Sequence, residues 1–320
     1  MGLRAGIDLG GTKIQAVIVG ARNGVRGQSR MPTPKDGGPE GVIKAMAEAV
    51  GAAAEDAKVK AGDLDGVGVG SPGDVENAAG TVANAYNVVP DWNHPVKVAE
   101  QLQKLTGARV ALGNDVRVAT LAEFELGAGK AYSSLLGVFW GTGVGGGIIL
   151  NGGPWQGRGA AGEIGHMVVR RNGARCTCGR RGCMEAYAGR KAMEIEAEHR
   201  HKNGAKTSLF KIMKKKGRPV MTSGVWAEAL EHDDELAVEL IERAIAALAA
   251  GVASAVNLLD VEAVVFGGGL GTRLGTPYIG RIEQQMQPHL FVDTRPPAVH
   301  VAALGDLSGA IGAALLVKPE

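Results

Sequence analysis

The chain has 320 residues, which is enough for two domains that each bury a core. Hydrophobic residues make up 45% and charged residues 21%, and a formal charge of +2 gives no reason to expect nucleic acid as a partner. The longest apolar runs are too short for a bilayer, and a strand-like run begins at Leu3. We therefore expect no signal peptide, no membrane partner and a cytoplasmic location.

Strand-like and helix-like segments alternate along the chain. Apolar, β-branched runs predict strands over residues 3–9, 14–19, 67–69, 110–112, 134–140, 148–150, 263–266 and 299–302. Helical periodicity covers residues 42–57, 96–105, 116–126, 235–258 and 308–316, and the chain is mainly helical after Glu185. This alternation predicts α/β layers.

One short pattern occurs twice. Asp8-Leu9-Gly10-Gly11-Thr12 and Trp140-Gly141-Thr142-Gly143 each end a strand, form a glycine-threonine loop and precede another apolar strand. The repeat predicts two similarly built domains that face each other.

The two glycine loops suit phosphate better than a dinucleotide. Gly141, Gly143 and Gly146 have the spacing of the dinucleotide fingerprint, but that motif needs a helix directly after the loop, and residues 148–150 indicate a strand. Residues 10–13 lack the Walker A spacing. Backbone N–H groups and threonine hydroxyls in two such loops can cradle the β- and γ-phosphates of ATP, although each loop alone could be a plain β-turn.

Asp8 ends a strand beside the first loop and is placed to hold Mg²⁺ through water. The candidate ATP- and phosphate-binding residues at this end of the chain and in the second loop are Asp8, Gly10, Gly11, Thr12, Lys13, Gly141, Thr142 and Gly143.

All three cysteines fall within eight residues, at Cys176, Cys178 and Cys183, and His166 stands ten residues before the first. Three thiolates and one imidazole are the ligand set of a closed, four-coordinate zinc site. Three cysteines cannot all form disulfides within one chain. The alternatives are scattered buried thiols or a redox-active pair.

Together these motifs resemble the ROK family of sugar kinases, repressors and uncharacterised proteins, in the actin, Hsp70 and hexokinase (ribonuclease H-like) fold group. The resemblance is carried by the ordered set of residues 8–13, 113–115, 141–147, 162–166, 176–185 and 267–269. It implies a two-domain α/β fold with a central cleft. We expect a smaller domain from residues 1–113 plus 304–320 and a larger domain from residues 114–303 that carries the zinc loop.

The resemblance also implies roles for individual residues. Asp115 matches the base that takes the proton from the attacking hydroxyl, and Asn114 matches a residue that binds sugar hydroxyls. Glu163, His166 and Glu185 match further sugar-binding residues, with the zinc site fixing their loop.

Asn87 corresponds to a family asparagine that stands before a tryptophan. The chain departs from the family there, because it has Tyr-Asn-Val-Val instead of Pro-Asn-Leu and one extra residue before Trp92. The departure makes Asn87 a weaker match than the other sugar-binding residues.

Chemistry agrees with these roles. Phosphoryl transfer asks mainly for positioning, charge neutralisation and one carboxylate that accepts the hydroxyl proton. Asp115 lies between a strand and a helix, where the alternative is a helix N-cap. One ring nitrogen of His166 can bind zinc while the other donates to a hydroxyl.

Two glycine patterns near the C-terminus also bear on the site. Gly267, Gly268 and Gly269 follow a buried strand and allow close approach of adenosine. Gly309 and Gly312 suit tight helix packing, and Asp306 and Ser308 suit helix caps.

The sequence thus predicts an ATP-dependent hexokinase, and phosphorylation of glucose at the 6-hydroxyl is the preferred interpretation. We expect Mg²⁺ to accompany ATP and a structural Zn²⁺ to occupy the cysteine loop. Alternative substrates are N-acetylglucosamine, N-acetylmannosamine, fructose, mannose and allose, and polyphosphate is an alternative donor. A sugar-responsive repressor is the least favoured reading, because no DNA-binding segment precedes Leu3. A homodimer or higher homo-oligomer is expected from the resemblance alone.

Overall fold

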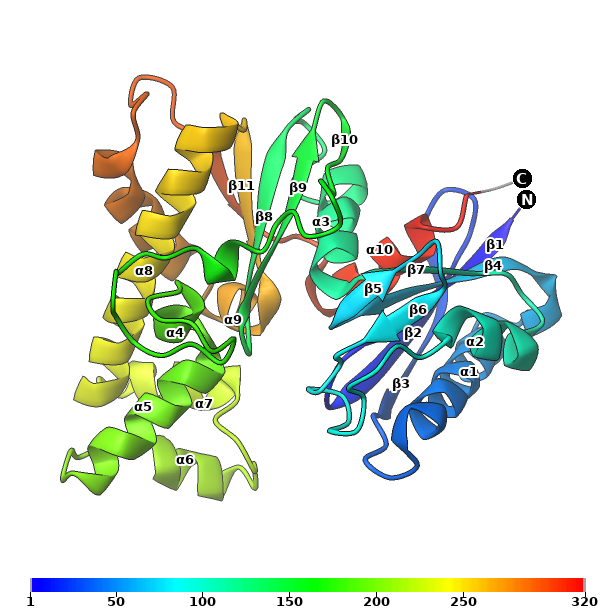
Figure 1. Cartoon of the computed structure of the whole chain (residues 1–320), viewed down its shortest axis with the longest axis horizontal. Helices are drawn as coiled ribbons and strands as arrows, with labels where there is room; N and C mark the ends of the chain where they lie inside the picture. Colours follow the sequence, from blue (N-terminus) through cyan, green and yellow to red (C-terminus); the bar gives the residue numbers. More distant parts are fainter. Residues whose placement is uncertain (1, 319–320) are drawn as a thin grey trace. The chain divides into compact units, whose positions relative to one another are not determined.

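The computed structural model describes residues 2–318, and the chain forms two compact units (Figure 1). The first unit comprises the residues up to Lys130 together with those from Leu304 onward, and the second unit runs from Ala131 to Ala303. None of the helices formed by residues 2–318 is long and apolar enough to cross a membrane.

The first unit is built on a five-stranded mixed sheet in the order β3-β2-β1-β4-β7. β1, β2 and β3 are antiparallel neighbours, whereas β1, β4 and β7 are parallel. Its elements are β1 (Leu3–Leu9), β2 (Lys13–Val19), β3 (Val25–Pro32), α1 (Gly38–Asp56), η1 (Ala61–Asp63), β4 (Leu64–Ser71), β5 (Asp74–Glu76), β6 (Thr81–Ala83), α2 (Val98–Thr106), β7 (Val110–Asn114), α3 (Asp115–Leu126), η4 (Gly305–Leu307) and α10 (Ser308–Leu315).

Alternation along β1 decides which helices cover which face of this sheet. Ala5, Ile7 and Leu9 are fully buried in the same apolar cluster as α1 and α2. The residue between them, Gly6, faces α10, where an added Cβ would lie 2.0 Å from the carbonyl oxygen of Ala310. The missing side chain therefore lets α10 lie directly on the opposite face of the sheet.

The second unit repeats this architecture with a sheet in the order β10-β9-β8-β11-β12, antiparallel on one side of β8 and parallel on the other. Its elements are β8 (Leu135–Trp140), β9 (Val144–Leu150), β10 (Gly153–Pro154), η2 (Ile164–His166), α4 (Glu185–Ala188), α5 (Arg190–Lys202), α6 (Leu209–Lys215), α7 (Ser223–Glu231), α8 (Glu235–Leu259), β11 (Ala263–Gly267), α9 (Gly268–Met286), η3 (Gln287–His289) and β12 (Ala298–Val301).

The predicted α/β class and the actin/hexokinase-like fold are confirmed. The units divide at residues 130 and 131, whereas the expected domain boundary lies at residues 113 and 114. α3 belongs with the first unit because α10 packs closely on it: a Cβ added at Gly312 would lie 1.8 Å from the carbonyl oxygen of Val118. The small residue at 312 thus has the packing role that its motif predicts.

Three local expectations were wrong or incomplete. β3 has mostly exposed or half-buried side chains, so it lacks the apolar signal of a strand. β9 begins at Val144, which puts residues 145–147 in a strand instead of a loop. α10 follows the turn η4 with the apolar Leu307 at its N-cap, and Asp306 pairs with Lys13 and Arg30 instead of capping the helix.

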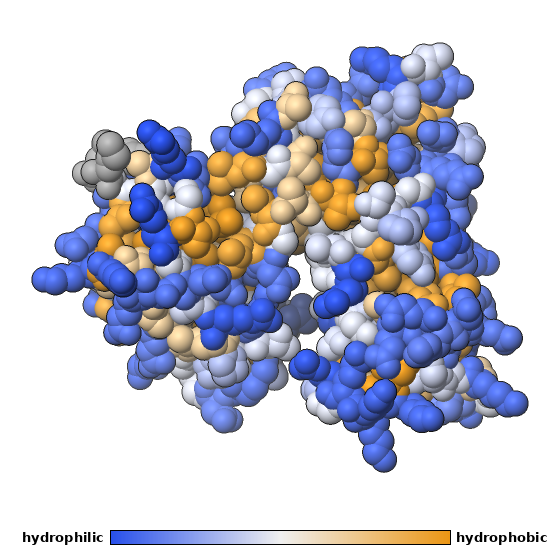
Figure 2. Space-filling model, turned by 180° about the vertical axis from the view of Figure 1, so that it is seen from behind, coloured by the Kyte–Doolittle hydropathy of each residue, from blue (hydrophilic) through white to orange (hydrophobic). Residues whose placement is uncertain are grey.

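The face drawn in Figure 2 mixes hydrophilic and hydrophobic residues. Among the large apolar side chains, Phe291 and Leu258 in the second unit are the most exposed, at 90% and 81%. The segments that carry them are in contact, because the Phe291 amide donates to Asn257 Oδ1 at 2.8 Å.

Candidate active site

The first glycine loop is held by residues that follow β3. Thr33 Oγ1 donates to the carbonyl oxygen of Gly10 at 2.7 Å, and the Thr33 amide donates to the carbonyl oxygen of Thr12 at 3.2 Å. Lys35 Nζ donates to the carbonyl oxygen of Gly11 and, at 3.0 Å, to that of Val88. Sequence reasoning missed both supports, because only the pairing of β2 with β3 brings residues 33 and 35 beside the loop.

Asn87 lies next to this loop. A Cβ added at Gly11 would be only 2.2 Å from the carbonyl oxygen of Asn87, so the loop can approach this main chain only with glycine at that position. The Asn87 side chain is exposed. The structure therefore brings one predicted sugar-binding residue and the predicted phosphate loop together within the first unit.

Asn114 and Asp115 occupy the junction between β7 and α3. The Asn114 Oδ1 atom accepts from the amides of Val116 and Arg117 at 3.1 and 3.2 Å, so Asn114 is the N-cap of α3. Asp115 is the first helical residue, and its Oδ1 atom accepts from the Val116 amide at 2.9 Å. The capping role that was the alternative for Asp115 thus belongs chiefly to its neighbour.

The parallel strands β1, β4 and β7 end at the same edge of the sheet. Asp8 on β1 pairs with Gly70 on β4, and Ser71 on β4 pairs with Asn114 on β7. Adjacent strands are about 4.8 Å apart, so Asp8 and Asn114 are separated by roughly two strand spacings along this edge. Asp8, the first glycine loop and Asp115 therefore share one edge of the first unit.

Asp8 is half-buried and lies against α10. A Cβ added at Gly309 would lie 2.7 Å from the carboxyl carbon of Asp8, so a small residue is needed there. Burial raises the pKa of Asp8, Lys13 lowers it, and Asp306 raises it further. A carboxylate oxygen at this position suits Mg²⁺, which prefers hard oxygen ligands, and a bound cation would favour the ionised form.

The second glycine loop contains residues 141–143, and the Gly141 amide donates to the Gly143 carbonyl oxygen at 2.9 Å. The strand that follows it confirms that no helix begins at this loop, as the dinucleotide fingerprint would require. Thr142 is exposed. A Cβ added at Gly143 would lie 2.2 Å from Glu185 Oε2, so glycine there lets this carboxylate approach the loop for a reason that the sequence does not reveal.

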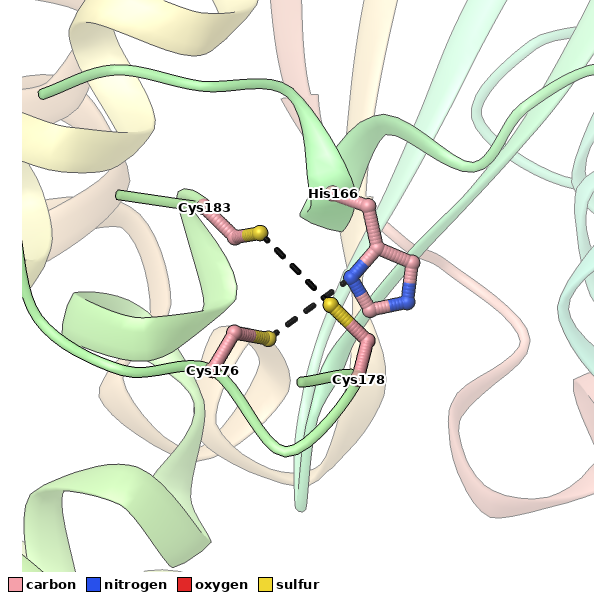
Figure 3. A group of neighbouring side chains, drawn as sticks. All are labelled: His166, Cys176, Cys178 and Cys183. Carbon is pink, nitrogen blue, oxygen red and sulfur yellow. Dashed lines mark hydrogen bonds between the residues drawn. The ribbon is translucent and has the colours of Figure 1, made fainter. Parts of the chain in front are cut away.

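The four predicted zinc ligands converge (Figure 3). His166 Nδ1 lies 3.8 Å from Cys176 Sγ, Cys178 Sγ lies 3.7 Å from Cys183 Sγ, and all four ligand atoms lie within 4.8 Å of one another. Ligands about 2.0–2.3 Å from a tetrahedral zinc ion lie roughly 3.5–3.8 Å apart, so the donor set and its spacing fit zinc. The thiols are neither scattered nor within the bond length of a disulfide.

Tight turns bring these ligands together. The Cys176 amide donates to the Arg180 carbonyl oxygen at 2.8 Å, and Gly179 within this turn has φ of +86°. Gly182 also has positive φ, at +83°, and a Cβ there would lie 1.9 Å from the Arg170 carbonyl oxygen. The glycines between the last two cysteines are therefore required by the backbone itself.

Protons occupy part of this cluster. Burial raises the pKa of the Cys176 thiol to about 12, with the Glu185 carboxylate adding to that effect, and burial also raises the pKa of Cys183. Zinc binds cysteine as thiolate, so metal binding at this cluster must release protons.

Glu185 connects the cysteine loop to the second glycine loop. Its Oε1 atom accepts from Thr177 Oγ1 at 3.2 Å and lies 3.7 Å from Cys176 Sγ, while its Oε2 atom accepts from the Val144 amide at 2.9 Å. Glu163 is exposed and immediately precedes η2, which ends at His166. The second unit thus places Glu185 in contact with the Cys/His cluster, of which His166 is a member.

Gly268 and Gly269 form the first turn of α9, with Gly267 as its N-cap. Gly268 has φ of +81°, and a Cβ there would lie 2.6 Å from the Trp140 carbonyl oxygen. A Cβ added at Gly141 would be 3.8 Å from the Gly269 amide. Both glycine clusters of the second unit therefore meet where β8 and β11 end.

Fold and site together define a two-unit α/β protein with two glycine loops and a cluster of three cysteines and one histidine, and the comparisons with known proteins identify its family. A family model described as the ROK family matches residues 4–320. The chain is 32% identical over 319 residues to the glucokinase of Thermotoga maritima, covering 98% of this chain and 96% of that protein. It is 33% identical over 314 residues to the N-acetylmannosamine kinase of Haemophilus influenzae, covering 98% and 94%.

Among solved structures, a ROK family glucokinase from Streptomyces griseus in complex with glucose and AMPPNP matches with a TM-score of 0.83 and 31% identity, covering 98% of this chain and 99% of that one. This chain belongs to the ROK family.

Proposed function

We propose that this protein is an ATP-dependent hexose kinase that phosphorylates glucose at the 6-hydroxyl. The observation that carries the proposal is the shared edge of the first unit, where Asp8, the first glycine loop and the Asn114–Asp115 pair come together. A phosphate-binding loop beside a carboxylate at a helix start is the combination that phosphoryl transfer to a hydroxyl needs.

Asp115 is the proposed base. Its carboxylate accepts the proton of the sugar hydroxyl while the hydroxyl oxygen attacks the γ-phosphorus of ATP, and the bond between that phosphorus and the β,γ-bridging oxygen breaks. The N-cap bonds of Asn114 and the bond from the Val116 amide orient this carboxylate before substrate arrives.

The two glycine loops are the proposed cradle for the ATP phosphates, with residues 267–269 beside the adenosine. Asp8 is the proposed protein ligand for Mg²⁺, which neutralises charge on the phosphates when bound. Thr12, Lys13 and Thr142 supply donors to phosphate oxygens.

Asn87, Asn114, Glu163, His166 and Glu185 are the proposed sugar-binding residues. His166, Cys176, Cys178 and Cys183 would hold a structural zinc ion, which supplies no open position for chemistry and serves to order the loop. With Nδ1 of His166 turned toward Cys176, the other ring nitrogen can donate to a sugar hydroxyl.

An N-acetylhexosamine is the second candidate substrate, because the N-acetylmannosamine kinase of Haemophilus influenzae is as similar to this chain as the glucokinase of Thermotoga maritima. The test is a coupled ADP-release assay over a panel of hexoses and N-acetylhexosamines with purified protein. We expect the highest kcat/KM with glucose. A higher kcat/KM with N-acetylmannosamine would transfer the proposal to that substrate, and absence of ADP release with every sugar would reject the kinase.

Location and assembly complete the proposal. Free thiols at the metal cluster suit the reducing cytoplasm, and a homodimer is our expectation for the assembled protein. Light scattering coupled to size-exclusion chromatography measures the mass of the assembly; a mass equal to that of one chain would reject the dimer.

A further inference from the structure

The first two residues of α5 donate main-chain hydrogen bonds to the second glycine loop. The Arg190 amide donates to the Gly141 carbonyl oxygen at 3.1 Å, and the Lys191 amide donates to the Thr142 carbonyl oxygen at 3.0 Å. These bonds use carbonyl oxygens of the loop and join it to the segment that follows the cysteine cluster.

The Arg190 side chain makes a second connection. Its Nη2 atom donates to Thr142 Oγ1 at 2.7 Å, and its Nη1 atom donates to the Met221 carbonyl oxygen at 2.5 Å. Met221 is itself fixed, because its amide donates to Glu194 Oε1 at 2.9 Å. The planar guanidinium therefore sits between two anchored acceptors, which limits its motion.

This contact determines what the Thr142 hydroxyl can do. A threonine hydroxyl carries one hydrogen and two acceptor lone pairs, whereas a guanidinium can only donate. Arg190 therefore occupies a lone pair of Oγ1, and the hydroxyl hydrogen is directed away from the guanidinium. Because Thr142 is exposed, that hydrogen is available to an acceptor outside the protein.

We propose that Arg190 is a positioning residue for the nucleotide: it orients the Thr142 hydroxyl so that its hydrogen is donated to a phosphate oxygen of ATP. This inference deepens the proposed function and rests on it. The Arg190 side chain acts through the Thr142 hydroxyl, and its positive charge raises the donor strength of that hydroxyl.

The test is a double-mutant cycle of Arg190→Met and Thr142→Val, with KM for ATP, KM for the sugar and kcat measured for each variant. We expect each single variant to raise KM for ATP ~10-fold, as for the loss of one charge-assisted hydrogen bond, with KM for the sugar unchanged. The double variant should resemble Thr142→Val, because the proposal has the Arg190 side chain act through the Thr142 hydroxyl alone. Arg190→Lys should recover part of the affinity.

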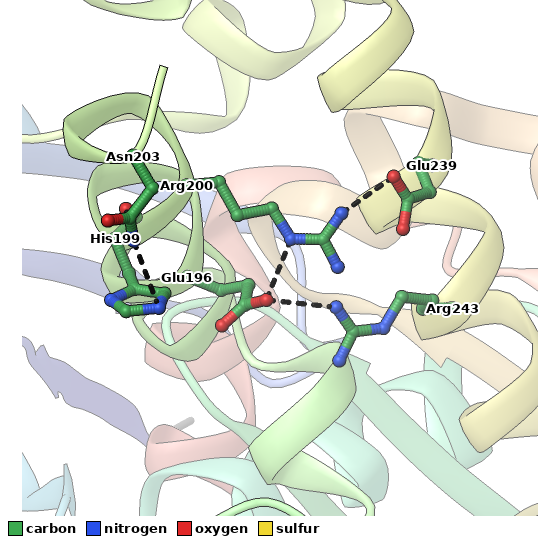
Figure 4. Close-up of polar contacts among 6 residues, drawn as sticks. All are labelled: Glu196, His199, Arg200, Asn203, Glu239 and Arg243. Carbon is green, nitrogen blue, oxygen red and sulfur yellow. Dashed lines mark hydrogen bonds and ion pairs between the residues drawn. The ribbon is translucent and has the colours of Figure 1, made fainter. Parts of the chain in front are cut away.

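Arg200 provides a matched control on the same helix. Its guanidinium pairs with Glu196 at 2.8 Å and Glu239 at 2.6 Å, in a network that also includes Arg243 (Figure 4). Arg200→Met removes the same chemical group without touching the loop. We expect it to leave KM for ATP unchanged.

Three outcomes would overturn the proposal: an unchanged KM for ATP in Arg190→Met, fully additive effects in the double variant, or equal changes in Arg190→Met and Arg200→Met. If the wild type releases no ADP with any sugar, AMPPNP binding by calorimetry takes the place of KM in the same cycle. A wild type that binds AMPPNP but phosphorylates nothing rejects only the kinase, and one that binds no nucleotide rejects both proposals.

Discussion

The two glycine loops occupy equivalent places in two sheets with the same strand order and directions. The first joins β1 to β2 and has four residues between the paired Leu9 and Ile14. The second joins β8 to β9 and has three residues between the paired Trp140 and Val144. The antiparallel strand pair that occurs in both sheets therefore sets the position of each loop, whereas the residues that support the two loops differ.

The supports of the loops have different origins. Thr33 and Lys35, which follow β3, donate hydrogen bonds to the main chain of the first loop. The second loop is held by Glu185 and Arg190, which lie more than forty residues further along the chain and begin α4 and α5 after the cysteine cluster. One loop is thus supported by residues that follow a strand of its own sheet, whereas the other is supported by the segment that follows the Cys/His cluster.

The largest expected effect is in the first unit. We predict that Asp115→Ala lowers kcat by ~10³-fold while ATP and sugar still bind, because the base is lost and the loops are untouched. Steady-state kinetics and calorimetry measure the two properties. Activity above a few per cent of wild type would reject Asp115 as the base.

Removal of one metal ligand tests whether only the second loop depends on the cluster. We predict that Cys178→Ser loses zinc and raises KM for the sugar and for ATP by ~10–100-fold, because Glu185 joins the cysteine loop to the Val144 amide. Metal content by mass spectrometry and both KM values check this. A zinc-free variant with normal KM for ATP would separate the loop from the cluster.

Substituting alanine for one glycine of each loop compares how rigidly the two loops are supported. Gly11→Ala places a Cβ against the main-chain carbonyl of Asn87, which cannot yield, and should lower stability by about 1–3 kcal/mol. Gly143→Ala places a Cβ against the end of the Glu185 side chain, which can move, so its stability loss should be smaller.

Chemical denaturation measures both variants, with Gly24→Ala as a control because no atom lies within 4 Å of a Cβ added there. A larger loss for Gly143→Ala than for Gly11→Ala would show that the second loop is the more rigidly supported one.

The smallest effect concerns the pH dependence of stability. Burial raises the pKa of Asp8 in the folded protein above its value in the unfolded chain, so binding of a proton to this carboxyl favours folding. The stabilisation from that proton is complete below the unfolded pKa, and it is lost as the pH rises through the folded pKa. We predict that Asp8→Asn without Mg²⁺ is more stable than wild type at neutral pH, by roughly 2–4 °C in Tm, with the gap closing at acidic pH. An identical gap at every pH would mean that Asp8 does not titrate this way.

The sequence predicted local structure well where the hydrophobic periodicity and the turn-forming residues agree. The run before Gly10 predicts β1, and the alanine-rich periodicity predicts α8 to within one residue of its observed end. Neither β3 nor the β5–β6 hairpin was predicted, because their exposed or very short strands carry little apolar signal.

Within the candidate site, the residue types could be predicted and their partners could not. The cysteine spacing with His166 indicates zinc, and the structure brings those four ligands together. The roles of Asp115, Asn87, Asn114 and Glu163 remain proposals. Arg190 carries no motif, since an arginine at the start of a helix is common and only its contact with Thr142 distinguishes it.

The sequence by itself determined the family, the α/β class, the two glycine loops and the four residues that meet in the Cys/His cluster, because these depend on residue types at fixed short spacings. Only the tertiary structure decided what supports each loop and which atoms a Cβ at Gly11 or Gly143 would meet. Those answers depend on close approach between segments about twenty to eighty residues apart, and packing alone establishes which atoms meet there.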